Sequence, residues 1–234
     1  RSGSYLLAPL LGAWLLTWLD PATVFTLIGF MSCLAFLPIC MMDFSHPSYK
    51  RHLEQEKEFG RAWKSAFNAV MSNSRLWFAG TLEMLVYLVT YSIKAFLPLY
   101  ALYAADFNLL AVGLFFTVQE AAHLVIRPIG GRLGDRVGYL TAINAGYLVL
   151  FVGLLLLPYA TSHVELLAIA VVVGAGQGLI FPSTVAFVSR CVDTRHLGAG
   201  MGFLGAVRNF GKVAGPLTAG ALLTRMDYSQ VFHL

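Results

Sequence analysis

The chain has 234 residues, of which 58% are hydrophobic and 12% are charged, and its formal net charge is +4. Soluble globular domains carry about 25% charged residues because their surfaces face water. This composition excludes an ordinary soluble enzyme, a disordered segment and a nucleic-acid-binding protein, and it predicts an all-α integral membrane protein.

Apolar runs long enough to cross a bilayer, roughly 20 residues, define the predicted elements. These are helices because backbone groups in hydrocarbon must form hydrogen bonds within their own segment. A shorter run at 5–19 comes first, and an apolar start at 229–234 comes last. Between them, full spans are predicted at 22–42, 78–103, 108–128, 139–159, 164–187 and 200–224.

The connections between these runs differ sharply in charge. Eleven of the sixteen Lys and Arg residues lie in the long segment 43–77, in the turns after the runs 108–128 and 164–187, or, as Arg127, at the end of the run 108–128, whereas the opposite connections hold only Arg225. The positive-inside rule therefore places segment 43–77 in the cytoplasm. We expect a multi-pass protein of the plasma (inner) membrane, in which 43–77 is a solvated linker with an amphipathic helix rather than a binding site.

An internal repeat relates the two ends of the chain. Residues 1–27 align without a gap on residues 208–234, with ten identities that include Pro9 on Pro216. The first run thus corresponds to the seventh, six crossings later, so the halves are parallel repeats, as in one large transporter class. We expect a fragment of a protein with about twelve spans, whose missing N-terminal spans are its partners. The predicted units are 1–42 (the last two helices of the N-terminal half), 43–77 (the linker) and 78–234 (the C-terminal half, five spans and the start of the last).

A glycine-rich segment, IGGRLGDRVGYL, follows the run 108–128. It predicts a tight cytoplasmic turn, in which Gly131 and Gly138 allow close helix approach or a positive φ. Asp135 is expected to accept hydrogen bonds from free backbone amides at the start of the next helix. Arg136 is expected to add positive charge on the cytoplasmic side and to pair with a carboxylate. A phosphate-binding loop is disfavoured because the spacing is not that of a P-loop. The residues of the motif are Gly131, Leu133, Asp135, Arg136 and Gly138.

This segment resembles the signature turn of the major facilitator superfamily of secondary transporters, and the resemblance covers essentially the whole chain. It implies a bundle of the type found in that superfamily, alternating access, and a monomer when the protein is full length. The residues Gly211, Gly215 and Pro216 are similar to the glycine–proline motif of proton-coupled drug antiporters. Ala8 replaces the corresponding glycine in the first half, where that motif is diagnostic.

Small residues recur at fourfold spacing in three places, which predicts close helix packing. These are Gly174 with Gly178, Gly198 with Gly202, and Gly211 with Gly215 and Ala219.

Ionisable side chains at bilayer depth cost at least ~2.5 kcal/mol each, which makes each of them a candidate functional group. We expect substrate binding or proton coupling at Lys94, Glu120, His123, Gln177, Arg208, Lys212 and Arg1. One hypothesis pairs Arg1, or a neighbour, with Glu120 across the boundary between the halves, either as a proton-sensitive switch or as a permanent salt bridge. The excess cations Lys94, Arg208 and Lys212 either attract an anionic substrate or pair with carboxylates on missing spans.

These features favour a secondary transporter that exports a small molecule against protons. Uptake of a sugar, peptide or organic anion is the alternative within that class, and a channel or a receptor on the same scaffold is a further one. An intramembrane enzyme using His123 and Glu120 is a remote alternative, because no nucleophile or metal-ligand spacing accompanies them. We expect the lipid bilayer and a small-molecule substrate as partners, no nucleic acid, no metal, and no cofactor other than the proton gradient as driving force.

Overall fold

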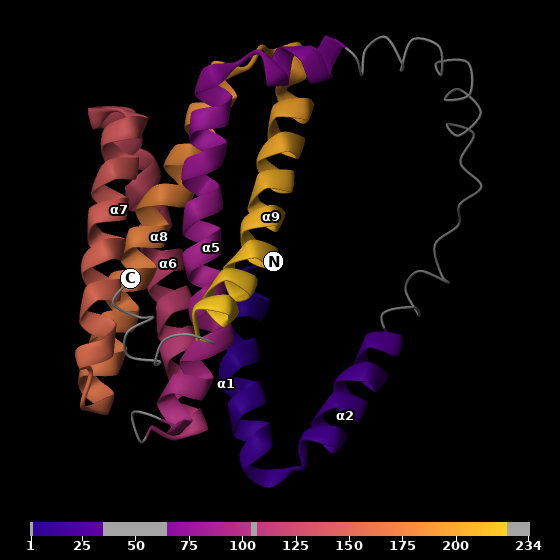
Figure 1. The fold of residues 1–234 in the computed structure, drawn as a ribbon, viewed down its shortest axis with the longest axis vertical. Coiled ribbons are helices and arrows are strands. Elements are labelled where there is room, and N and C mark those ends of the chain that lie inside the picture. The colour runs from indigo at the N-terminus through magenta and orange to yellow at the C-terminus, as the bar shows by residue number, and fades with distance from the viewer. Residues whose placement is uncertain (1, 35–64, 104–106, 224–234) are drawn as a thin grey trace.

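The computed structural model describes residues 2–34, 65–103 and 107–223, and every regular element in these ranges is a helix (Figure 1). Two 3₁₀ turns, Leu157–Tyr159 and Thr194–His196, follow α7 and α8. The long helices are α1 (Ser2–Trp18), α2 (Pro21–Leu34), α5 (Ser74–Tyr103), α6 (Leu109–Val137), α7 (Tyr139–Leu156), α8 (His163–Cys191) and α9 (Leu197–Leu223).

Four helices are long and apolar enough to cross a membrane: α5, α6, α8, and α7 together with its following turn. Helix α9 has 27 residues but is less apolar, because it contains Arg208, Asn209 and Lys212 beside many glycines. The amphipathic helix predicted in the linker lies mostly outside the described residues, although 65–71 are helical. The predicted assignment of 1–42 and 78–234 to two halves of a longer protein stays a prediction.

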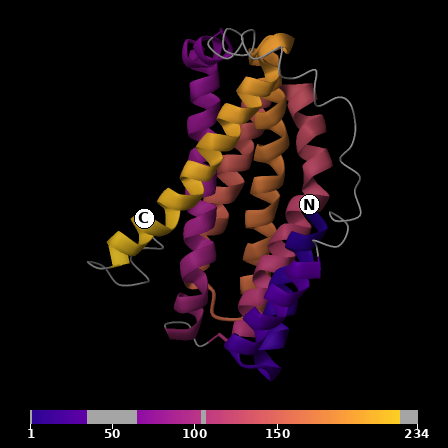
Figure 2. The same cartoon turned by 90° about the vertical axis from the view of Figure 1, so that its right-hand side faces the viewer.

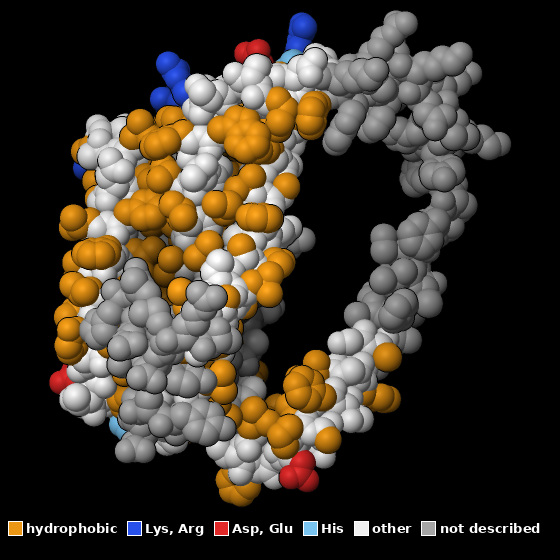
Figure 3. Space-filling model, in the orientation of Figure 1, with side chains coloured by type: hydrophobic (Ala, Val, Ile, Leu, Met, Phe, Trp, Pro, Cys, Tyr) orange, Lys and Arg blue, Asp and Glu red, His pale blue; other side chains and the backbone are white. Residues whose placement is uncertain are grey.

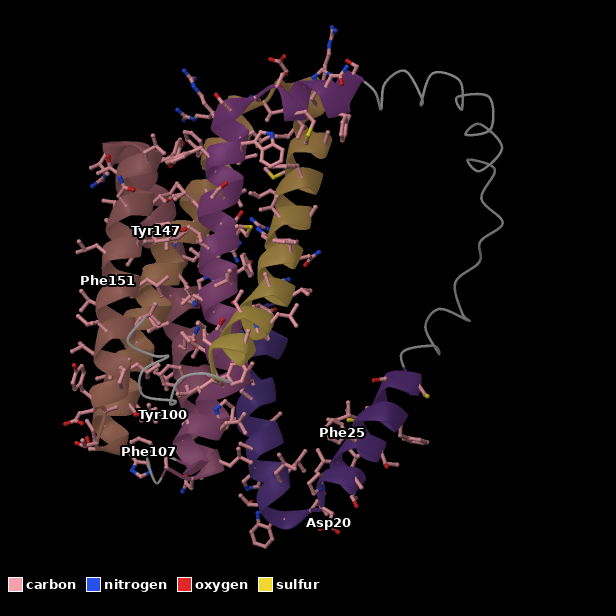
Figure 4. All side chains as sticks on the ribbon, viewed as in Figure 1. Asp20, Phe25, Tyr100, Phe107, Tyr147 and Phe151 are labelled. Atoms are coloured by element: carbon pink, nitrogen blue, oxygen red, sulfur yellow. The ribbon has the colours of Figure 1, made fainter. Side chains whose placement is uncertain are left out.

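The helices pack mainly in pairs. Helix α6 packs against α8 and α1, α8 also packs against α7, and α9 packs against α5. The slanted α9 crosses α5 and swings outward toward its C-terminal end (Figure 2). Helix α2 diverges from the bundle (Figure 1), and its Phe25, labelled in Figure 4, is 73% exposed.

Glycines make two of these pairings close. A Cβ atom added to Gly174 of α8 would meet the carbonyl oxygen of Gln119 on α6, and one added to Gly211 of α9 would lie 2.5 Å from the carbonyl oxygen of Met84 on α5. The predicted close packing is therefore confirmed at these positions. It is wrong for Gly198 and Gly202 within the described residues, because an added Cβ there would meet nothing within 4 Å.

Helix directions agree with the repeat. Helices α1 and α9 run in the same direction (Figure 1), as parallel repeats require. The start of α5, the α6–α7 turn and the α8–α9 connection share one end of the bundle, and Asp20 lies at the opposite end (Figures 1 and 4). Apolar side chains cover much of the visible flank between the ends (Figure 3). This distribution suits a bundle whose flanks face lipid.

Candidate functional site

Three helices bring charged and aromatic side chains to one region. On α5, Tyr87, Tyr91 and Lys94 follow at intervals of four and three residues, so they share a face. Glu120 of α6 and Arg208 of α9 form ion pairs with residues of α5. Every one of the intramembrane positions predicted from the sequence is described except Arg1, which lies outside the described residues.

Glu120 lies at the centre of a three-residue group. Its Oε1 is 3.1 Å from Nζ of Lys94, and its Oε2 is 3.4 Å from Nδ1 of His123. Phe181 of α8 packs edge-to-face on the His123 ring, with ring centroids 5.2 Å apart. Glu120 is thus paired within the described chain, whereas the hypothesis of a partner at Arg1 remains a prediction.

Arg208 is paired with a carboxylate that sequence reasoning did not place in the site. Its Nη2 lies 2.8 Å from Oε1 of Glu83, whose side chain is 0% exposed. The expectation that Lys94 and Arg208 are uncompensated is wrong, because both have a carboxylate partner on a neighbouring helix. Helix α5 begins at Ser74 rather than at 78, so Glu83 is its tenth residue, and α9 packs against this part of α5.

Lys212 differs from the other two cations. Among the described residues no carboxylate oxygen lies within 4.0 Å of it. Its Nζ donates to Oδ1 of Asn209 at 3.2 Å, and it lies 5.3 Å and 5.6 Å from the ring centroids of Tyr87 and Tyr91. These distances are typical of cation–π contacts.

Gln177 belongs to a different polar group, buried between helices. It accepts a hydrogen bond from Gln119 at 3.0 Å and donates one to Thr90 at 2.9 Å, and all three side chains are buried. These two hydrogen bonds therefore link α6, α8 and α5. Sequence reasoning named Gln177 but missed Gln119 and Thr90; a glutamine next to Glu120 in an otherwise apolar run was the available indication.

The glycine-rich motif is mostly helix rather than turn. Helix α6 continues to Val137, and the reversal is made by Gly138 alone, with φ of +95°. The predicted positive φ is confirmed at Gly138, but an added Cβ at Gly131 would meet nothing within 4 Å, so the predicted close approach is wrong there. Its neighbour Gly130 makes that approach instead, to the carbonyl oxygen of Gly178. Periodicity explains the difference, because adjacent helical residues face different directions.

Asp135 has a different partner from the one predicted. Helix α7 has no side-chain cap at its start, and Oδ1 of Asp135 instead accepts from the hydroxyl of Tyr139 at 2.6 Å. The guanidinium of Arg190, on α8, lies 4.9 Å from the Tyr139 ring centroid. The motif thus ties α6, α7 and α8 together at one end. The carboxylate partner expected for Arg136 is not found within 4.0 Å among the described residues.

The glycine–proline motif lies on the contact with α5. Added Cβ atoms at Gly211 and Gly215 would meet the backbone carbonyls of Met84 and Leu88. Pro216 lies inside α9, which remains helical to Leu223. Within the described residues no three His, Cys, Asp or Glu side chains gather as a metal site would require.

Comparison with known proteins places these features in a family. Residues 82–234 match the family described as Major Facilitator Superfamily. The chain is 25% identical to the multi-drug resistance efflux pump PmrA of Streptococcus pneumoniae, over 97% of this chain and 56% of that protein. It is 22% identical to the quinolone resistance protein NorA of Staphylococcus aureus, over 63% of this chain and 38% of that protein.

A third relative is similar over a shorter stretch. An MFS-type transporter of Mycobacterium tuberculosis is 32% identical, over 48% of this chain and 20% of that protein. The chain spans at most 56% of the length of these three relatives.

Proposed function

The chain belongs to the major facilitator superfamily, and from this membership we propose that the complete protein is a secondary transporter that exports a small organic compound in exchange for protons. Its apolar helices make it a multi-pass membrane protein. Family membership speaks for a transporter rather than an enzyme. The name of PmrA, a multi-drug resistance efflux pump, supports export over uptake, and the resistance named for NorA agrees with that direction.

The group formed by Lys94, Glu120 and His123 carries the proposal of proton coupling. Glu120 is the twelfth of the 29 residues of α6, far from either helix end, and its side chain is 18% exposed. Ionisable groups inside a membrane helix commonly mark proton relays. A proton that binds the Glu120 carboxylate removes its negative charge, and the attraction to Lys94 across the α5–α6 contact is lost.

This change in charge supplies the differential interaction that a two-state transporter needs. A ligand shifts a conformational equilibrium only when it interacts differently with the two states. In the proposed cycle the ionised Glu120 holds α5 and α6 together through Lys94, and the protonated form favours the alternative arrangement. The site would then alternate its access between the two membrane faces.

The test uses the complete protein in proteoliposomes with an imposed pH gradient and ethidium, a lipophilic cationic dye, as the transported probe. The variant Glu120→Gln is expected to lose transport driven by the pH gradient while it still equilibrates the dye down its own gradient. Glu165→Gln is the matched control, because Glu165 is an exposed carboxylate in the first turn of α8 and glutamine can keep the capping box. Unchanged coupling in Glu120→Gln would refute the proposed role of Glu120.

The direction of transport is tested in the same preparation. Vesicles with the cytoplasmic face outward should accumulate the dye when their lumen is acidic, if the protein exports its substrate against protons. Accumulation only in vesicles of the opposite orientation would favour the alternative, an uptake permease.

A further inference from the structure

We propose that Lys212, together with the rings of Tyr87 and Tyr91, binds an aromatic carboxylate as transported substrate. The inference rests on the transport function proposed above and adds a substrate class to it. It starts from the charges that α5, α6 and α9 bring together.

The charges of this region do not balance. Lys94 and Arg208 pair with Glu120 and Glu83, which leaves the positive charge of Lys212 without a carboxylate within 4.0 Å among the described residues. A charged side chain at the centre of a membrane helix is costly unless an opposite charge or a hydrogen-bond partner compensates it. Lys212 is the sixteenth of the 27 residues of α9, so it is far from either end of that helix.

The contacts of Lys212 in the structure offset only part of this cost. Cation–π contacts compensate a buried charge only in part, and the acceptor Oδ1 of Asn209 is neutral. An anion placed beside Nζ would provide a charge-assisted hydrogen bond, which is roughly twice as strong as a neutral one. Nε of Arg208, one helical turn before Lys212, is also buried and has no hydrogen-bond partner among the described residues.

The aromatic side chains favour a flat ligand. The ring centroids of Tyr87 and Phe181 lie 5.0 Å apart, and those of Tyr87 and Tyr91 lie 6.2 Å apart, so three helix-borne rings form one aromatic group. Such groups accept a further ring in offset or edge-to-face contact. A carboxylate on a ring therefore matches both the excess cation and the rings beside it.

Benzoate is the probe, with acetate as the non-aromatic anion and ethidium as the cation. Transport is measured in proteoliposomes of the complete protein, and binding is measured as the rise in melting temperature of the purified protein. Lys212→Gln is expected to raise the KM for benzoate at least tenfold, to abolish its thermal stabilisation, and to raise the KM for benzoate much more than the KM for ethidium. Lys212→Arg should restore benzoate transport to within threefold of the unsubstituted protein, because it restores the positive charge.

A matched control separates Lys212 from positive charge in general. Arg195→Gln removes one cation from the exposed α8–α9 connection and is expected to leave both KM values unchanged. If Lys212→Gln folds poorly, Tyr91→Leu is the second variant. It keeps the three cations and is expected to weaken benzoate binding without changing acetate binding.

Each outcome decides between the two proposals. If the unsubstituted protein transports ethidium but benzoate neither moves nor raises the melting temperature, the substrate inference is wrong and the transport function stands. If acetate stabilises the protein as strongly as benzoate, or Lys212→Gln binds benzoate normally, the inference is also overturned. If neither probe is transported, the transport proposal is refuted, and the thermal shift alone then decides whether Lys212 binds the anion.

Discussion

Glu83 and Arg208 lie 125 positions apart in the sequence and meet at 2.8 Å, with the carboxylate fully buried. Their pairing holds α9 against α5 where glycines let the two backbones touch. One oxygen of Glu83 has no hydrogen-bond partner among the described residues. The ion pair with Arg208 is therefore the main interaction that stabilises the buried negative charge.

We expect Arg208→Gln to destabilise the protein by about 3–5 kcal/mol, because removal of one partner leaves the other charge buried and uncompensated. The double variant Glu83→Gln/Arg208→Gln should recover a large part of this loss. Unfolding free energies of the purified complete protein and of the single and double variants give the coupling energy. Additive effects of the two substitutions would contradict the pairing.

The α5–α9 contact predicts a sharp difference between two glycines of one helix. Gly211→Ala forces a Cβ against the Met84 carbonyl and should cost about 1–3 kcal/mol, as overpacking does. Gly205→Ala adds a Cβ that meets nothing within 4 Å, so it should be neutral or stabilise by up to about 1 kcal/mol. Melting temperatures of the two purified variants test this order, and equal losses would be incompatible with the described packing.

The motif at the end of α6 contains a second matched pair. Gly138 has φ of +95° and ψ of 143°, a region that only glycine adopts readily, so Gly138→Ala should cost about 1–3 kcal/mol in backbone strain. Gly131→Ala lies inside the helix with open space around its added Cβ, and should stabilise by up to about 1 kcal/mol. Thermal unfolding of both variants provides the comparison; a harmless Gly138→Ala would rule out the single-residue turn.

Gln177 was expected to act in binding or coupling, whereas its contacts predict a role in stability. Gln177→Leu leaves the amide of Gln119 and the hydroxyl of Thr90 without their partner. In membrane helices each such hydrogen bond contributes roughly 0.6–2 kcal/mol. We expect a loss of this size in the unfolding free energy, an unchanged KM for transported probes, and partial recovery in Gln119→Leu/Gln177→Leu. A tenfold change in KM without loss of stability would restore the binding role.

Local patterns predicted helix positions well and contacts between helices poorly. Hydropathy located α5 to α8 because burial in lipid depends on each segment's own composition. It placed the end of α6 near 128 instead of Val137, since hydropathy reports the edge of the apolar region and a helix can continue beyond it. The Glu83–Arg208 pair could not be predicted, because it depends on how α9 crosses α5. The spacing of the glycines alone also could not show whether Gly130 or Gly131 approaches the backbone of α8.

Backbone contact at Gly174, Gly211 and Gly215 brings four of the helices together as two pairs. At these points no side chain separates the backbones of the two packed helices. Helices α5 and α9 form one closely packed pair, and α6 and α8 form another. The plane between the pairs is crossed by the Lys94–Glu120 ion pair and by the hydrogen bond from Gln177 to Thr90. In the transport cycle proposed above, a proton on Glu120 would therefore act on the contact between these two helix pairs.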